Sequence, residues 1–326
     1  MLTIDGSYLE GGGQIVRTAV ALSATTGSPV TIVHIRDSRD RPGLAAQHMA
    51  AVRAVAGVCG AQVDGLTQGS RSITFNPGTP ERRDIALDLG TAGSIPLVLQ
   101  AWLPVAVRTG GSITLTGGTE VHMSPTIDYF EHVLASELQM AGASIEVEVL
   151  QRGYYPRGGG QVRIRVAPAT LSRFTGVGGS GSAGICSCSS GLPPHVAERQ
   201  AAAALRLLSP VFGPDFNAVL DQRDGPSTGS SVTAWMGAKG GIALGKRGLP
   251  AEKVGEAAAR QLIDEIERPG MVDVHLSDQL LVYLAQYGGC YSTHTLSPHA
   301  ATVCWLLEQF GFPVEIRRGE VVEFSA

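Results

Sequence analysis

The chain has 326 residues, of which 44% are hydrophobic and 17% are charged, and its formal net charge is −4. This length predicts two units or one unit with an insertion, and the composition is sufficient for a large core. Proteins that coat long nucleic acids are usually basic, so the slightly acidic balance predicts that any nucleic-acid contact is local and excludes a DNA-duplex binder.

The sequence gives no sign of a disulfide framework, a signal or a membrane span. The five cysteines are scattered, and Cys186-Ser-Cys188 has no second pair to complete a metal site. The start "MLTIDGSYLEGGG" lacks a basic and then apolar segment, and the longest apolar run, 95–107, is too short to cross a bilayer. These features predict a soluble, cytoplasmic protein with no membrane partner.

In chain order, the predicted elements repeat as helix–strand–helix–strand. Three of the helices end at Gly60, Gly142 and Gly311, where glycine is a favoured C-terminal cap. Six segments each predict an amphipathic helix and a following strand: 12–35, 48–65, 90–117, 130–149, 276–295 and 299–318. The pattern therefore predicts three α/β units that bury their apolar faces against one another.

The glycine spacing also predicts an insertion. The interval from Gly142 to Gly311 is about twice the interval from Gly60 to Gly142. The excess lies between a Gly/Ser-rich join (176–184) and "ERPGM" (267–271), and it contains helical patterns at 193–208 and 250–267 with a strand at 230–236. We therefore predict a large three-repeat domain of residues 1–183 and 271–326, with a small α+β domain, 184–270, inserted in the third repeat.

Several polar residues lie at predicted helix starts, where backbone N–H groups attract anions. In "EGGGQIVR" (10–17), Glu10 could hold a metal ion and Arg17 could face a phosphate, although a solvated carboxylate and a surface arginine are the simpler reading. "HIRDSRDRPGLAAQH" (34–48) carries three arginines suited to phosphate, interleaved with aspartates that could neutralise them. These arginines are Arg36, Arg39 and Arg41.

Further polar residues lie later in the chain. Gln100 lies within an apolar helix, where it could contact a base edge or mark a helix boundary. Asp278 and Gln279 are predicted at a helix start, where a capping carboxylate is common. The string "RGYYPRGGGQV" (152–162) has three glycines that allow a close backbone approach, which in isolation favours a structural loop over a phosphate cradle.

His299 follows Ser297-Pro298 at another predicted helix start. A lone histidine is usually structural. A neutral imidazole at an anion-binding helix start, with arginines elsewhere to spread phosphate charge, is also what a nucleophile toward phosphate needs. These residues alone leave both interpretations open.

The motifs together resemble the RNA 3′-terminal phosphate cyclase family. The strings that carry the resemblance occur in the family's order along essentially the whole chain: "DGSYLEGGGQIVR", "RPGLAAQH", "GTAGSIPLVLQ", "RGYYPRGGGQV", "SGLPPHVAERQ", "HLSDQL" and "SPHAAT". The family's fold is three repeated α/β units and one inserted domain, which agrees with the glycine spacing. The resemblance implies ATP-dependent conversion of an RNA 3′-phosphate to a 2′,3′-cyclic phosphate, through histidyl-AMP and an adenylylated RNA end.

The resemblance also implies roles for individual residues. His299 matches the nucleophile, Glu10 a carboxylate near a Mg²⁺ or Mn²⁺ ion, and Arg17 and Arg39 basic residues that face the phosphates. His294 matches no functional position and is expected to be structural. The ATP site matches Gln100, His275, Leu276, Ser277, Asp278 and Gln279, with Arg36, Arg41 and Gln47 as further basic or polar candidates.

Two departures and two rival interpretations remain. Thr302 is present after the histidine, but the family's following asparagine is not, and Glu120 stands where an asparagine is common. A cyclase-like branch that acts as a ribosome-assembly binding factor lacks the catalytic histidine, and enolpyruvyl transferases have six units. The sequence leaves the physiological RNA, the metal preference and the oligomeric state open.

Overall fold

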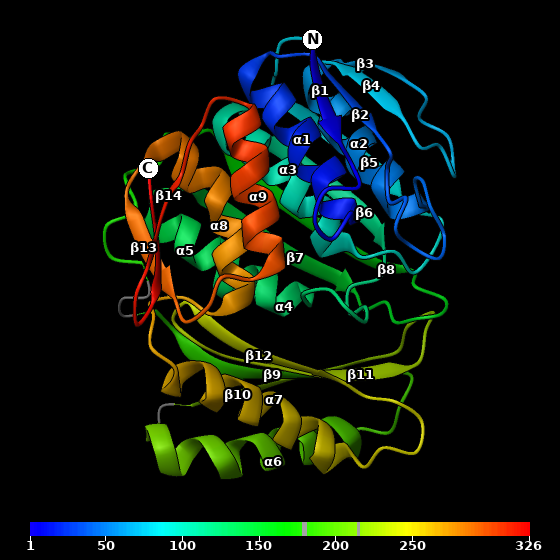
Figure 1. The fold of residues 1–326 in the computed structure, drawn as a ribbon. Coiled ribbons are helices and arrows are strands. Elements are labelled where there is room, and N and C mark those ends of the chain that lie inside the picture. Colours follow the sequence, from blue (N-terminus) through cyan, green and yellow to red (C-terminus); the bar gives the residue numbers. More distant parts are fainter. Residues whose placement is uncertain (178–180, 214–215) are drawn as a thin grey trace.

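The first unit consists of two helices packed on a four-stranded sheet (Figure 1). The structure is a computed structural model that describes residues 1–177, 181–213 and 216–326. The apolar stripes of both helices are buried in the main core. The strand order is β1-β2-β4-β3, with β1 parallel to β2 and the other neighbours antiparallel. Its elements are β1 (Leu2–Asp5), α1 (Gly13–Thr26), β2 (Val30–Val33), α2 (Ala46–Cys59), β3 (Gln62–Asp64) and β4 (Ile73–Asn76).

The second unit repeats this topology. Its sheet has the order β5-β6-β8-β7, again with one parallel and two antiparallel neighbours. Its second helix is one continuous helical stretch whose middle turn is a π-helix. Its elements are β5 (Arg83–Asp88), α3 (Ile95–Thr109), β6 (Gly111–Gly117), α4 (Ile127–Tyr129), η1 (Phe130–Ala135), α5 (Ser136–Met140), β7 (Ser144–Gln151) and β8 (Gly160–Ala167).

The third unit follows the same plan, but its first strand is reduced to a single bridge. Phe174 pairs in parallel with Gly289: its N–H donates to the Gly288 carbonyl (2.9 Å), and its carbonyl accepts from the Cys290 N–H (2.8 Å). The segment around Phe174 thus lies where β1 and β5 lie in the other units. The sheet order is β13-β15-β14. The remaining elements are α8 (Val274–Tyr287), β13 (Cys290–Thr293), α9 (Pro298–Gln309), β14 (Glu315–Arg318) and β15 (Val322–Ser325).

Between Phe174 and α8, the chain forms another sheet with two helices on one face, below the three units in Figure 1. Both faces of this sheet are buried: Ile185 and Val232 pack in a core with the two helices, while Cys186 and Trp235 join the core of the three units. The sheet order is β10-β9-β11-β12. The elements are β9 (Ala183–Ser190), α6 (His195–Phe212), β10 (Ala218–Arg223), β11 (Gly229–Met236), β12 (Lys239–Leu244) and α7 (Ala251–Glu267).

The α/β class is confirmed, but the unit predicted from the sequence was incomplete. Each of the first two units begins with a strand that was not predicted and has one strand more after its second helix. Gly60, Gly142 and Gly311 all have positive φ, as predicted for helix ends. The Gly/Ser-rich join, 176–184, includes residues 178–180, which lie outside the described residues. In the described part of the chain, no helix is both long and apolar enough to cross a membrane.

Candidate active site

His299 lies in the first turn of α9, as predicted. The Ser297 hydroxyl accepts the N–H of Ala300 (3.0 Å) and so caps the helix, and Pro298 occupies its first position. This start leaves the His299 side chain 51% exposed at the end of the helix where N–H groups are unpaired.

Two side chains from the other end of the chain hold the His299 imidazole. Its Nδ1 lies 2.8 Å from Glu10 Oε2 and 3.0 Å from Gln14 Oε1. The Gln14 amide nitrogen in turn donates to Asp278 Oδ2 (2.6 Å). Because Nδ1 faces two acceptors, it carries the proton of the neutral ring, and the lone pair is on Nε2. The imidazole of His299, the amide of Gln14 and the carboxylates of Glu10 and Asp278 thus form one hydrogen-bonded network.

Asp278, which accepts from Gln14, and Arg17 carry opposite charges next to these residues. Burial raises the pKa of the Asp278 carboxyl to about 6, although His299, His275, Gln14 and Arg17 oppose the rise. Burial also lowers the pKa of Arg17 to about 10, which Asp278 partly offsets, so the guanidinium stays charged at neutral pH. Arg17 is only 9% exposed and therefore provides a desolvated positive charge.

A small cavity of about 30 Å³ opens between α1, α3 and α8. Gln279 Oε1 and Tyr283 Oη are buried there without a hydrogen-bond partner among the described residues. An unpaired buried acceptor and hydroxyl fit a ligand with polar edges. The other lining residues are Gln14, Arg17, Thr18, Gln100, Pro104, Leu134, Asp278 and Val282.

Of the three arginines in 34–48, only Arg39 approaches the glycines beside Glu10. Its Nη2 lies 3.4 Å from where a side chain on Gly12 would begin. Arg36 instead donates to the Gly43 carbonyl (2.8 Å), which gives it a structural role in its loop. Arg41 is exposed.

His48 packs against the start of α1. A Cβ at position 13 would collide with the His48 ring, which explains the glycine there. The ring accepts the Ala45 N–H through Nδ1 (3.0 Å). Burial, with Arg17 and Arg36 nearby, lowers the pKa of His48 to about 3, so it is neutral. Gln47, its neighbour, accepts the Ser94 N–H at the start of α3 (3.3 Å).

The prediction that Asp278 lies at a helix start was wrong. The N-cap of α8 is Asp273, whose carboxylate accepts the N–H groups of His275 and Leu276 (2.8 and 2.7 Å). Asp278 therefore lies in the second turn, where it reaches Gln14. In the same stretch, His275 is exposed, whereas Leu276 and Ser277 are fully buried and Ser277 bonds back to its own helix.

Arg152, from the string 152–162, lies in a buried ionic cluster away from His299. Its guanidinium donates to both oxygens of Asp128 (2.7 and 2.9 Å), to Glu120 (2.7 Å) and to Asp221 on β10 (2.8 Å). Burial raises the pKa of Glu120 to about 7, although Arg152 opposes the rise. Glu120, one of the two departures from the family's motifs, is thus a partner of Arg152 in this cluster.

Asp128, Cys186 and Cys188 lie close enough to share a metal ion. The two sulfur atoms are 3.4 Å apart. However, Arg152 already supplies the counter-charge to Asp128, and a cation would have to displace it. These residues are therefore explained by the ionic cluster.

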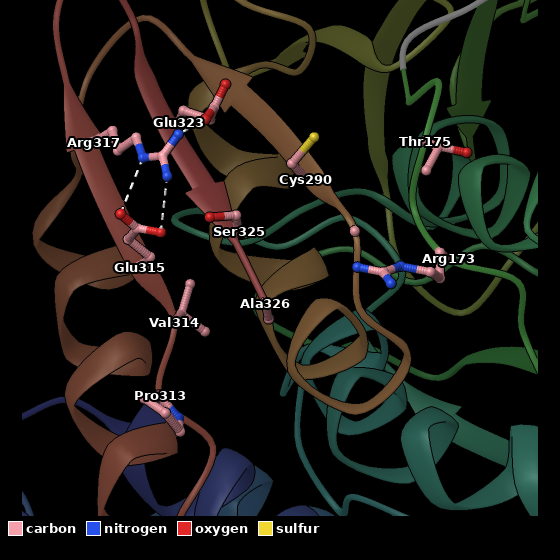
Figure 2. Close-up of a pocket in the computed structure, with 11 residues that line it drawn as sticks. Arg173, Thr175, Cys290, Pro313, Val314, Glu315, Arg317, Glu323, Ser325 and Ala326 are labelled. Carbon is pink, nitrogen blue, oxygen red and sulfur yellow. Dashed lines mark hydrogen bonds and ion pairs between the residues drawn. The ribbon is translucent and has the colours of Figure 1, made fainter.

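A larger hollow, of about 720 Å³, lies on the outer face of the third unit's sheet (Figure 2). It shares no lining residue with the His299 site. Arg317 there is paired with Glu315 (3.0 Å) and lies 3.9 Å from Glu323, so its charge is already compensated. Among the described residues, the lining of this hollow contains no histidine that could act as a nucleophile toward phosphate.

The structure brings together most of the residues chosen from the sequence. Glu10, Arg17, Gln100, Asp278, Gln279 and His299 all lie at one junction of α1, α3, α8 and α9. Gln14, which links His299 to Asp278, was not predicted from the sequence. Its position three residues before Arg17 on a predicted helix was the available signal, because that spacing places both on one face.

This fold and site define an α/β protein of three related units with a histidine held at a helix start by side chains of the first unit. A family model described as RNA 3′-terminal phosphate cyclase matches residues 8–317. The chain therefore belongs to the RNA 3′-terminal phosphate cyclase family, as its motifs indicated.

Relatives that carry the name RNA 3′-terminal phosphate cyclase support this assignment. The protein of Methanococcoides burtonii is 44% identical over 100% of this chain and 99% of its own length. That of Methanosarcina mazei is 43% identical, with 95% of each chain covered. That of Nitrosospira multiformis is 44% identical over 95% of this chain and 91% of its own.

Proposed function

We propose that this protein uses ATP to convert an RNA 3′-terminal phosphate to a 2′,3′-cyclic phosphate, with AMP carried on His299. The proposal rests on the contacts of His299 Nδ1 with Gln14 Oε1 and Glu10 Oε2, which leave the lone pair of Nε2 available. Family membership and the names of the relatives supply the substrate.

In the first step, His299 Nε2 attacks the α-phosphorus of ATP. The N–P bond forms, the bond from that phosphorus to the bridging oxygen breaks, and pyrophosphate leaves. The ring becomes positively charged as it bonds, and the oxygens at Nδ1 stabilise that charge. The desolvated Arg17 and the exposed Arg39 supply positive charge for the phosphates.

In the second step, an oxygen of the RNA 3′-phosphate attacks the phosphorus of the AMP, and the bond to Nε2 breaks. In the third step, the 2′-hydroxyl of the same ribose loses its proton and attacks the phosphorus of the RNA 3′-phosphate. The bond from that phosphorus to the bridging oxygen breaks, and AMP leaves. The hydroxyl is already adjacent, so proximity accelerates this step. DNA lacks that hydroxyl and cannot be cyclised.

The cavity beside Asp278 presents polar groups that could meet the base edge of ATP, although at about 30 Å³ it would have to widen to admit the base. Gln279 Oε1 is a buried acceptor that an amino group on a base edge would satisfy. Gln100, on α3, lines the same cavity. The exposed His275 lies on α8, the helix that carries Gln279.

A divalent cation, Mg²⁺ or Mn²⁺, would be held by Glu10, whose carboxylate oxygens are ligands that both ions prefer. Glu10 is 32% exposed and lies at His299, so it is open to an incoming cation. The ion would supply charge neutralisation on the phosphate oxygens.

This chemistry belongs to the large domain formed by residues 1–183 and 271–326, into which residues 184–270 are inserted as a second domain. We further propose that the protein is cytoplasmic. The alternative is a binding factor without catalysis.

The test is covalent labelling. The protein is incubated with α-³²P-ATP and Mg²⁺ or Mn²⁺ and analysed by denaturing electrophoresis, alongside His299→Ala and, as a control, His294→Ala. His294 is partly buried and lies 3.1 Å from Arg268, away from the site. We expect an acid-labile, base-stable label on the wild type and the control, and none on His299→Ala.

Absence of label on the wild type with either metal would favour the binding factor. Equal label on wild type and His299→Ala would show that His299 is not the nucleophile. The accepting end would then be identified by incubating the labelled protein with RNA that ends in a 3′-phosphate.

A further inference from the structure

An aromatic pair joins the loop that carries Glu10 to the helix that carries His299. Tyr8, two residues before Glu10, stacks on Trp305 of α9 with ring centroids 4.0 Å apart and an interplanar angle of 17°. Trp305 is partly buried, and Tyr8 is 39% exposed. This contact joins the same two segments that meet at the Glu10–His299 pair.

The loop between β1 and α1 is joined to the sheet at its start, where the Gly6 N–H donates to the Val33 carbonyl (2.7 Å). From Ser7 to Gly11, apart from the Glu10 contact with His299, the hydrogen bonds between described residues are local: the Gly11 N–H donates to the Tyr8 carbonyl (2.9 Å), and Ser7 bonds to Asp5. Leu9 has φ of 49° and is 56% exposed, and a non-glycine residue in this region is disfavoured unless its surroundings hold it.

We propose that Tyr8 and Trp305 are a positioning pair that holds Glu10 at His299. The inference rests on the proposed function for the meaning of Glu10, but the pair itself is defined by geometry. Stacked rings attract beyond their buried area, and this excess corresponds to about a 2- to 10-fold change in the population of a loop position. Neither ring is among the side chains bonded to His299 in the described part of the chain, so we infer that both act through the position of the Glu10 carboxylate.

The kinetic test measures self-adenylylation against Mn²⁺ concentration in Tyr8→Ala, Trp305→Ala and Trp305→Phe. If Glu10 holds the cation, both alanine variants need about 2- to 10-fold more Mn²⁺ for the half-maximal rate, and the rate at saturating Mn²⁺ changes less. Trp305→Phe retains a ring and should restore most of the wild-type dependence. Tyr155→Ala is the control, because Tyr155 is 75% exposed on the loop after Arg152.

A second measurement does not depend on activity. Hydrogen exchange of the Gly11 amide reports release of the loop, and we expect it to be about 2- to 10-fold faster in both alanine variants than in wild type and Trp305→Phe. An unchanged Mn²⁺ dependence or an unchanged exchange rate in a folded Trp305→Ala protein would overturn the proposal. If the wild type takes no label, the proposed function fails, and the exchange rates alone decide whether the pair holds the loop.

Discussion

At the scale of single residues, the site depends on an acid that is costly to ionise. Asp278 accepts a proton more readily in the folded chain than in the unfolded one, because burial raises its pKa from 3.8 to about 6. Its contribution to the free energy of unfolding is therefore fully present below about pH 4 and is lost as the pH rises through 6. Ionised Asp278 therefore lowers the free energy of unfolding at neutral pH, but its carboxylate positions Gln14 at His299.

Asp278→Asn removes the ionisation but keeps an oxygen that accepts from Gln14. Compared with wild type, we expect the variant to gain about 1–3 kcal/mol in free energy of unfolding at pH 8, with the gain shrinking toward pH 4. We expect slower self-adenylylation because the charge beside Arg17 is lost. Denaturant unfolding at pH 4.5, 6 and 8 measures the first effect, with the exposed Asp64→Asn as control. A gain in free energy of unfolding that does not change with pH would contradict the raised pKa of Asp278.

At the scale of elements, the start of α8 joins three parts of the fold. The buried Asp273 carboxylate accepts the N–H groups of His275 and Leu276, the Tyr129 hydroxyl (2.8 Å) and the N–H of Gly240 on β12 (2.8 Å). The helix that carries Asp278 is thus fixed to the second unit and to the inserted sheet through one side chain.

Asp273→Ala leaves all four donors without their acceptor. We expect a loss of about 3–5 kcal/mol in free energy of unfolding, since each buried unpaired group costs about 1–3 kcal/mol and relaxation recovers part of this. Denaturant unfolding measures the loss, and the exposed Asp264→Ala on α7 is the control and should change it by less than about 0.5 kcal/mol. Equal stability of the two variants would show that α8 does not need this cap.

The helices show which elements could be predicted from the sequence. Their apolar periodicity and glycine ends are local signals, and α1, α2, α3 and α9 lie where those signals predicted. The leading strands β1 and β5 and the short β4 were not predicted, because they do not follow a predicted helix, which marked the start of strands such as β2 and β13. Asp278 was predicted at a helix start, whereas the N-cap is Asp273, which was not predicted. The bonds of Asp273 to Tyr129 and Gly240, distant along the chain, could not be found from local patterns.

At the scale of the whole molecule, Arg152 joins the second unit to the inserted sheet. It bonds Glu120 and Asp128 on one side and Asp221 on the other, with all four side chains largely buried. A buried charge is tolerated when it is paired, and removal of one partner leaves the others exposed to the full desolvation cost. The string around Arg152 is distinctive, but partners this distant along the chain could not be predicted from local patterns.

Arg152→Met leaves three carboxylates in a buried space. We expect a loss of at least about 3–5 kcal/mol in free energy of unfolding at pH 8. The loss should be smaller at pH 6, because Glu120, whose pKa is about 7 beside Arg152 and rises further without it, is then protonated. Arg165→Met, a 46% exposed arginine on β8, is the matched control. A loss that is the same at both pH values would show that Glu120 does not titrate in this cluster.

The contact between Gln14 and His299 spans 285 positions of the chain. During synthesis, the glutamine emerges among the first residues, whereas the imidazole appears only after the first two units, the inserted sheet and the first part of the third unit have been translated. A product of interrupted translation that stops before His299 holds the acceptor side chains without the ring. The capacity to modify RNA ends would therefore arise late, and a ribosome that stalls before this codon would release no active fragment.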